Sequence, residues 1–294
     1  MKTFKLIDVF CSSGFSGNPV AAIFDADDLS ADKMQAIARW MNLSETVFLQ
    51  TPKDTRAAYR LRIFSPKAEL PFAGHPSVGT AFAAIDAGLV AAEAAEIVQE
   101  CGVGLVRLTV EGKGDDRIVF VTSPEPRVET ATSPGPDAIC RAMAQQSDDN
   151  LSHSIVDVGP RWLTVQLETE GRLRSLSPDF PALTQLSEEF SLTGLTAYAL
   201  SDDSRYQVAV RSFAPAHGIP EDPVCGSGNV SVAAHLNHTD GLTITGSHYV
   251  ANQGRELGRD GYVTVRVSED GRSISVGGRA KIRVSGTIMD TGPD

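Results

Sequence analysis

The stretch RIFSPKAELPFAGHPSVGTAFAA (residues 62–84) has a counterpart in RSFAPAHGIPEDPVCGSGNVSVAAH (residues 211–235). Both begin with Arg-x-Phe-small-Pro and run through a loop to a glycine, after which small residues lead into an Ala/Val-rich segment. Phe64 corresponds to Phe213 and Gly74 to Gly226, with three more loop residues in the second copy. Each copy therefore predicts a strand, a loop and the start of a helix.

A second matched pair lies upstream of these two stretches. GNPVAAIF begins at Gly17, and GPRWLTVQL begins at Gly159. Two matches at an offset of roughly 140 to 150 residues indicate a chain made of two similar halves. A Pro-rich break at 123–137 predicts the boundary, which gives halves of 1–124 and 125–294. A strand near 280–290 is a candidate for completing the first half.

Short segments with alternating apolar residues, such as TFKLIDVF and RIVFVTS, dominate the rest of the chain. This period of two predicts antiparallel sheet. Few helices interrupt it: one is predicted at 30–41 with Ser30 as its N-cap, and the others follow the two repeated loops. The fold class expected from the pattern is α+β.

The overall composition of the chain excludes several classes of function. The chain has 294 residues and a formal net charge of −11, without a Lys/Arg cluster, so a nucleic acid would be repelled. A small anionic substrate remains compatible, because a few local amides and cations outweigh a distant net charge. Four cysteines are scattered without a C-x-x-C pair, which argues against a zinc site or a disulfide framework. No segment predicts a membrane span or a signal peptide, so a cytoplasmic location is expected.

Both loops have a feature that suits them to bind an anion. The first turn of a helix leaves backbone N–H groups unpaired at the positive end of its dipole. Two such turns facing each other across a cleft would hold an anion or stabilise an enolate. An ordinary tight turn remains the alternative for each loop. Dinucleotide, nucleophile-elbow and Walker A motifs are absent from both loops.

Three acid/base candidates lie beside small turn residues. Glu45 stands in NLSETVF at a helix–strand junction, His75 stands in GHP, and Asp222 stands in EDP. A carbon-acid reaction needs a base held beside the substrate carbon, with a pKa near the working pH. The alternatives are a solvated glutamate at a strand start, a hydrogen-bonded loop histidine and an aspartate that caps a turn.

The segments GNPVAAIF, NLSETVFL, ELPFAGHPSVGTA, GPRWLTVQL and EDPVCGSGNVSVAAH together resemble the PhzF-like isomerase family of phenazine biosynthesis. The resemblance extends from about Asp8 to Met289. It implies the diaminopimelate epimerase-like fold, with two pseudo-symmetric domains that each wrap a curved or barrel-like antiparallel sheet round a central helix. It also implies a cofactor-independent homodimeric isomerase without a metal, whose active site lies between the domains.

The resemblance further implies roles for individual residues. In the phenazine enzyme a glutamate moves a proton between carbons of a dihydro-hydroxyanthranilate and so shifts a double bond. Carried over, Glu45 is the acid/base, and His75 and Asp222 position or polarise a small carboxylate-bearing substrate. The substrate's polar groups would be bound by residues of the two loops: Gly74, Cys225, Gly226, Ser227 and Gly228.

Cys225 departs from the family pattern. Phenazine enzymes typically carry threonine there, whereas related epimerases and proline racemases carry a catalytic cysteine. Those two-base enzymes need a second cysteine on the other loop, where this chain has Ala73. The thiol is then either a small buried residue or a proton carrier paired with Glu45. Two alternatives stay open: an amino-acid or hydroxy-acid epimerase that uses Cys225, and a family member that only binds a metabolite or a protein.

Overall fold

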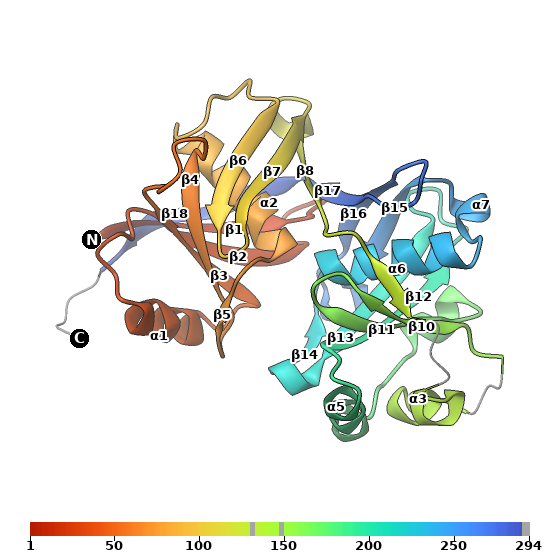
Figure 1. Cartoon of the computed structure of the whole chain (residues 1–294). Helices are drawn as coiled ribbons and strands as arrows, with labels where there is room; N and C mark the ends of the chain where they lie inside the picture. Colours follow the sequence, from red (N-terminus) through yellow and green to blue (C-terminus); the bar gives the residue numbers. More distant parts are fainter. Residues whose placement is uncertain (130–132, 147–149, 290–294) are drawn as a thin grey trace. The chain divides into compact units, whose positions relative to one another are not determined.

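The computed structural model describes residues 1–129, 133–146 and 150–289 (Figure 1). Contacts divide them into two compact units. The first is Met1–Thr122 together with the described residues from Gly277 onward, and the second is Ser123–Val276. The sequence predicted a division at 124/125 with a strand near 280–290 added to the first half. Residues 130–132 of the predicted Pro-rich break lie outside the described part.

The first unit is built mainly of strands, seen in red to yellow in Figure 1 except for β18, which is blue. They are β1 (Lys2–Val9), β2 (Asn18–Ile23), β3 (Glu45–Gln50), β4 (Tyr59–Phe64), β5 (Glu69–Leu70), β6 (Glu96–Cys101), β7 (Gly104–Glu111), β8 (Ile118–Thr122) and β18 (Ala280–Ile288). Its helices are α1 (Ala31–Met41), α2 (Gly74–Asp86) and the short 3-10 turn η1 (Gly114–Asp116). The chain returns to this unit within β17 (Ile274–Gly278).

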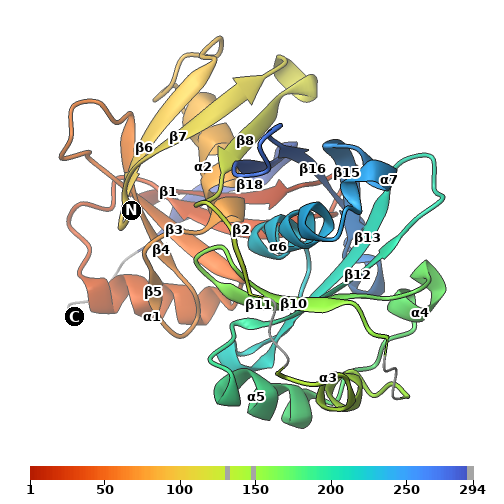
Figure 2. The same cartoon turned by 45° about the vertical axis from the view of Figure 1, so that its right-hand side comes forward.

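Helix α2 is the central helix of this unit, in contact with β1, β2, β3, β8 and β18 (Figure 2). Gly79 explains how closely the helix approaches the sheet. A Cβ at this position would lie 2.7 Å from side-chain atoms of both Val20 and Val9. The helix and the strands can therefore pack this tightly only with glycine there.

The second unit contains the strands β9 (Arg127–Glu129), β10 (His153–Asp157), β11 (Arg161–Gln166), β12 (Gly194–Leu200), β13 (Val208–Ala214), β14 (Ile219–Asp222), β15 (His248–Gln253) and β16 (Gly261–Val267). Its helices are α3 (Pro136–Ala142), α4 (Glu170–Arg174), α5 (Phe180–Glu189), α6 (Gly226–His238) and α7 (Leu242–Thr245), with the 3-10 turns η2 (Pro215–His217) and η3 (Arg255–Leu257). Helix α6 contacts β9, β10, β11, β12 and β16 and is the counterpart of α2.

The two units repeat the same strand pairing. In the first unit β1, β2, β3, β4, β6 and β7 are successive neighbours, with β5 beside β4. In the second unit β10, β11, β12, β13, β15 and β16 follow the same order, with β14 beside β13. Phe64 pairs with Thr46, and Phe213 pairs with Leu195 at the matching place. The predicted α+β fold of two related domains is confirmed.

The sheets are mixed, which differs from the purely antiparallel prediction. The pairs β2–β3 and β4–β6 are parallel, and so are β11–β12 and β13–β15. Parallel neighbours need a crossover connection, and helices α1, α2, α5 and α6 lie within these connections. The alternation of apolar residues in a single strand does not distinguish the two pairings.

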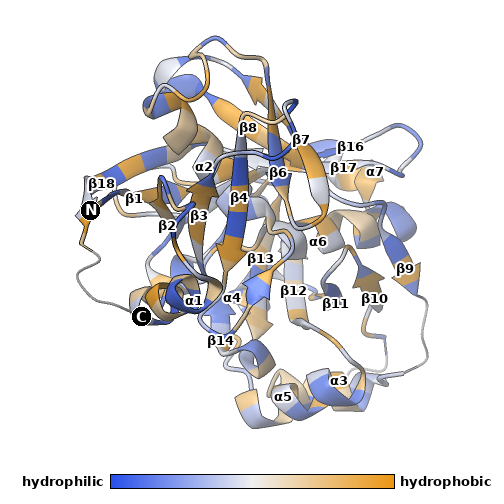
Figure 3. Ribbon diagram, turned by 60° about the vertical axis from the view of Figure 1, so that its left-hand side comes forward, coloured by the Kyte–Doolittle hydropathy of each residue, from blue (hydrophilic) through white to orange (hydrophobic). Residues whose placement is uncertain are grey.

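Local signals place the first helix as predicted. The Ser30 side chain accepts a hydrogen bond from Lys33 N at 3.2 Å, so it is the N-cap of α1. Met34 and Ala38 are buried on the apolar face of this helix. Some strands, β3 and β10 among them, carry apolar segments coloured orange in Figure 3, and all of β2 is buried. Within the described residues, every helix is too short or too polar to cross a lipid bilayer.

Candidate active-site loops

In the first unit, Glu45 and His75 are brought together by β3 and α2. Glu45 is the first residue of β3 and pairs with Val20 on β2. His75 is the second residue of α2, whose N-cap is Ala73. Because a methyl group cannot accept a hydrogen bond, the first turn of α2 has no side-chain cap.

The Glu45–His75 contact is close and buried. Nδ1 of His75 lies 2.9 Å from Oε2 of Glu45, and the two side chains are only 5% and 13% exposed. The contact is within ion-pair distance but outside hydrogen-bond geometry, since Oε2 of Glu45 has no hydrogen-bond partner among the described residues. Nε2 of His75 likewise has none there. A buried polar atom without a partner costs about 1–3 kcal/mol, so such atoms mark a place that a ligand would complete.

A buried chain of hydrogen bonds fixes the start of α2. Ser77 Oγ donates to Ala73 O at 2.8 Å, and Gln99 Nε2 donates to Ser77 Oγ at 2.8 Å. Gln99 is fully buried on β6. Ser77 and Gln99 were not predicted as site residues, because nothing in the sequence of β6 links it to the loop before α2.

In the second unit, Cys225 caps α6. Its Sγ accepts a hydrogen bond from Gly228 N at 3.3 Å, and the residue is 5% exposed. Asp222 acts on the turn just before: its Oδ1 accepts from Val224 N at 3.1 Å. Both side chains therefore hold the loop together. For Asp222 this is the turn-capping alternative considered from the sequence, whereas for Cys225 the sequence offered only a small buried residue as the alternative to proton transfer.

Gln253 joins three parts of this loop. Its Oε1 accepts from Cys225 N at 3.1 Å and from Asn229 Nδ2 at 3.0 Å, while its Nε2 donates to Asp222 O at 2.9 Å. Gln253 is fully buried at the end of β15. It was also missed from the sequence, because it lies 28 residues beyond Cys225.

Ser227 is the half-buried residue in the first turn of α6, next to buried glycines. Trp162 Nε1 donates to Ser227 Oγ at 3.0 Å, and Cys225 Sγ lies 3.5 Å from the same oxygen. Gly228 is needed for packing, since an added Cβ would lie 2.5 Å from Ser212 Oγ. At Gly74 the nearest atom to an added Cβ is 3.5 Å away, so packing does not demand glycine there.

The predicted site residues thus form two clusters, one in each unit. Gly74 and His75 begin α2 next to Glu45 in the first unit. The second unit holds the remaining five: Asp222, Cys225, Gly226, Ser227 and Gly228. Among the described residues, no group of three or more His, Cys, Asp or Glu side chains is arranged to hold a metal ion.

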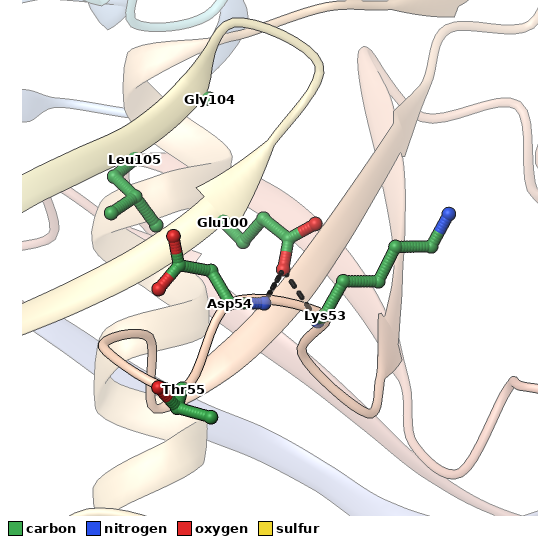
Figure 4. Close-up of a pocket in the computed structure, with 6 residues that line it drawn as sticks. All are labelled: Lys53, Asp54, Thr55, Glu100, Gly104 and Leu105. Atoms are coloured by element: carbon green, nitrogen blue, oxygen red, sulfur yellow. Dashed lines mark hydrogen bonds between the residues drawn. The ribbon is translucent and has the colours of Figure 1, made fainter.

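A pocket of about 490 Å³ lies elsewhere in the first unit (Figure 4). It is lined by Lys53, Asp54, Thr55, Glu100, Gly104 and Leu105. Glu100 Oε2 accepts from the N–H groups of Lys53 and Asp54, at 2.6 and 3.0 Å, while the Lys53 ammonium lies away from the carboxylates. None of the predicted site residues lines this pocket.

Comparison with known proteins identifies the family. A model of the phenazine biosynthesis-like protein family, PhzC-PhzF, matches residues 7–286. The chain belongs to this family. The resemblance noted in the sequence is thereby confirmed.

Individual relatives of this PhzF-family chain match over nearly its whole length. Antisense-enhancing sequence 1 of Schizosaccharomyces pombe is 40% identical over 97% of both chains. Trans-2,3-dihydro-3-hydroxyanthranilate isomerase of Pseudomonas chlororaphis is 34% identical over 99% of this chain and 98% of its own. A PhzF-family crystal structure from Bacillus anthracis covers 98% of this chain and 99% of its own, with a TM-score of 0.86 at 22% identity, and shows the shared fold. We therefore class the chain as an isomerase.

Proposed function

We propose that this protein is a cofactor-independent isomerase that moves a proton between carbons of a small carboxylate-bearing metabolite, with Glu45 as the general acid/base. The observation that carries the proposal is the buried Glu45–His75 pair, with Nδ1 and Oε2 2.9 Å apart and hydrogen-bonding capacity left over on both side chains. The named isomerase relative supports the same reaction type.

The chemistry follows from the two side chains. The Glu45 carboxylate takes a proton from a carbon next to a group that stabilises the resulting negative charge, and the carboxylic acid then returns the proton to another carbon. His75 lies against the carboxylate and can hold or polarise the substrate through Nε2. Since the pair is shielded from water, its electrostatic effect on a developing charge is stronger than in solvent.

The α6 loop supplies the binding part of the proposal. Asp222 and Gln253 fix the backbone of this loop, and Ser227 presents a half-buried hydroxyl at the positive end of the helix dipole. A carboxylate or enolate oxygen is the ligand that such a helix start favours. We assign Ser227 and the amides of Gly226 and Ser227 to substrate binding, while the Gly228 amide is committed to Cys225 Sγ.

The test is proton exchange with the substrate of the named relative. The full chain is incubated with trans-2,3-dihydro-3-hydroxyanthranilate in deuterated water, and double-bond shift and deuterium uptake are followed by NMR. Glu45→Gln should lower the rate by about 10²- to 10⁴-fold, because a general acid/base contributes that much. Glu96→Gln, an exposed glutamate of the same unit, is the matched control and should keep the wild-type rate.

Three results would contradict the proposal. Full turnover by Glu45→Gln would remove Glu45 from the chemistry. Exchange at Cα of an amino or hydroxy acid, lost on alkylation of Cys225, would instead favour an epimerase. If neither this compound nor a panel of small carboxylates exchanges protons, the binding-only alternative holds.

A further inference from the structure

The duplication allows the two loops to be compared position by position. The parallel pairing of β2 with β3 begins at Val20 and Glu45, and that of β11 with β12 begins at Trp162 and Gly194. Trp162 is therefore the counterpart of Val20. Gly194 is the counterpart of Glu45, which means that the second unit has no carboxylate at the acid/base position.

The central helices extend this correspondence. Gly74 begins α2 and Gly226 begins α6, so the second helical residues, His75 and Ser227, occupy matching places. The contact between Glu45 and His75 in the first unit thus has its counterpart at Gly194 and Ser227. An added Cβ at residue 194 would lie 2.0 Å from Phe213 O, so no side chain fits there.

Trp162 fills the role that residue 194 cannot. Its side chain comes from the neighbouring strand, is 3% exposed, and places Nε1 3.0 Å from Ser227 Oγ. The contact between Glu45 and His75 in the first unit is thus replaced in the second unit by the contact between the indole of Trp162 and the hydroxyl of Ser227. The pair that can exchange protons has become a pair that cannot, because an indole N–H only donates.

The indole fixes the direction of the serine hydroxyl. Since Trp162 Nε1 can only donate, Ser227 Oγ must accept, and the single Ser227 hydroxyl hydrogen is left to donate elsewhere. The other contact of Oγ among the described residues is Cys225 Sγ at 3.5 Å. Sulfur is a weak acceptor, and this one already accepts from Gly228 N, so an oxygen anion competes well for the hydrogen.

From this geometry we infer that Trp162 is a positioning residue: it orients the Ser227 hydroxyl as a donor, so that the α6 loop binds an acceptor oxygen and binds a charged carboxylate more strongly than a neutral carbonyl. The inference rests on the proposed function, in which Ser227 contacts the substrate. Trp162 acts on binding, not on the proton transfer.

A binding cycle on the full chain tests this inference. Calorimetry gives the Kd of anthranilate, which carries a carboxylate, and of anthranilamide, which carries a neutral amide in its place. Wild-type protein should prefer anthranilate, and Trp162→Phe should weaken anthranilate binding by about tenfold and anthranilamide binding by less, because the uncharged amide oxygen is the weaker acceptor. Ser227→Ala should have the same effect, and Trp162→Phe should add nothing in the Ser227→Ala background.

The second readout is the fluorescence of Trp162 itself. The chain has two tryptophans, and the other, Trp40, is 77% exposed on α1, so Trp40→Phe leaves Trp162 as the only emitter. Anthranilate should shift the Trp162 emission, and Ser227→Ala should abolish that shift. Folding of each variant is checked by its urea midpoint, so that a loss of stability is not mistaken for a loss of selectivity.

Several outcomes would overturn the inference. The first is that the losses in anthranilate affinity of Trp162→Phe and Ser227→Ala add up in the double variant. The second is that Trp162→Phe weakens the binding of both ligands equally. The third is that the wild-type protein binds anthranilate no better than anthranilamide, or does not bind it. The proposed function fails separately, through the Glu45→Gln exchange experiment. If Glu45→Gln is inactive but the binding cycle shows no coupling between Trp162 and Ser227, only the inference is refuted. If the cycle shows coupling but Glu45→Gln is active, only the acid/base assignment is refuted.

Discussion

Cys225 shows how one side chain can have a structural role in a loop rich in functional groups. Its sulfur accepts the Gly228 amide as the N-cap of α6, and Ala73 at the matching position of α2 makes no such bond. Capping requires an acceptor of small size, which serine or threonine also provides. We therefore expect serine or threonine to replace the cysteine as the cap of α6.

We predict that Cys225→Ser keeps both stability and isomerase activity, because the hydroxyl replaces the sulfur as the cap. Cys225→Ala should lower the free energy of unfolding by about 1 kcal/mol, the usual cost of losing a cap. Urea denaturation and the exchange rate in deuterated water measure the two effects. A rate loss of about a hundredfold in Cys225→Ser at unchanged stability would show that the thiol moves protons.

His235 makes the second unit sensitive to acid. It is 1% exposed on α6, with Nδ1 2.6 Å from Ser154 Oγ and Nε2 3.1 Å from Ser152 Oγ. Burial, followed by the nearby His238 and His153, lowers the pKa of His235 from 6.5 to about 4.

Because the unfolded chain binds this proton more readily, His235 favours unfolding as the pH falls from about 6.5 toward 4. The loss in free energy of unfolding should approach about 3 kcal/mol at the acid end, and none of it is felt above pH 7. His235→Gln, which keeps an amide beside the serines, should flatten the dependence. Urea midpoints between pH 4 and 7 measure it, and equal slopes in both proteins would refute the assignment.

At the scale of elements, each unit ties its short strand to the preceding long one with an arginine. In the first unit Arg62 forms a two-bond ion pair with Glu69, each bond 2.7 Å long. In the second unit Arg211 forms the same fork with Glu221, at 2.9 and 2.8 Å. The second pair is far more buried: its side chains are 6% and 9% exposed, against 19% and 43% in the first.

The same substitution should therefore have unequal effects in the two units. Arg211→Met leaves a buried carboxylate without its partner and should lower the free energy of unfolding by about 3–5 kcal/mol. Arg62→Met breaks a more exposed pair and should cost at most about 1 kcal/mol. Urea denaturation compares the two variants, and similar losses would contradict the role of burial.

The sequence predicted the elements that carry the repeat but not the contacts across them. The matching of Phe64 with Phe213 and of Gly74 with Gly226 was visible, because each pair lies in one continuous stretch. The indole contact of Trp162 and the buried amides of Gln99 and Gln253 were not visible, because they join strands to loops that lie far away in the chain. Strand register decides these contacts, and alternation alone leaves register open.

At the scale of the whole molecule, the second unit is continuous in the chain and has its own core. Buried residues from Ile139 to Phe213 form one of its apolar clusters. The first unit is discontinuous, since β18 pairs with β1 along its whole length, from Lys2 opposite Ile288 to Val9 opposite Ala280. Without β18, strand β1 would lose half of its hydrogen-bonding partners.

We predict that a fragment of residues 123–276 folds alone, with a cooperative unfolding transition, whereas residues 1–122 alone do not. Joining residues 277–289 through a short Gly/Ser linker to the front of 1–122 should restore folding, because the end of β18 lies opposite the start of β1. Circular dichroism during urea titration measures all three. Cooperative unfolding of 1–122 alone would show that β18 is dispensable.

The pairing of β1 with β18 also has a consequence for biosynthesis. A ribosome makes the chain from its N-terminus, so Ser123–Val276 is fully synthesised while Ala280–Ile288 is still to come. The first unit to begin synthesis is then the last that can close its sheet, and one edge of β1 stays unpaired until residues 280–288 have been made. During translation the nascent first unit therefore exposes an unpaired strand edge, a surface that favours aggregation until β18 is added.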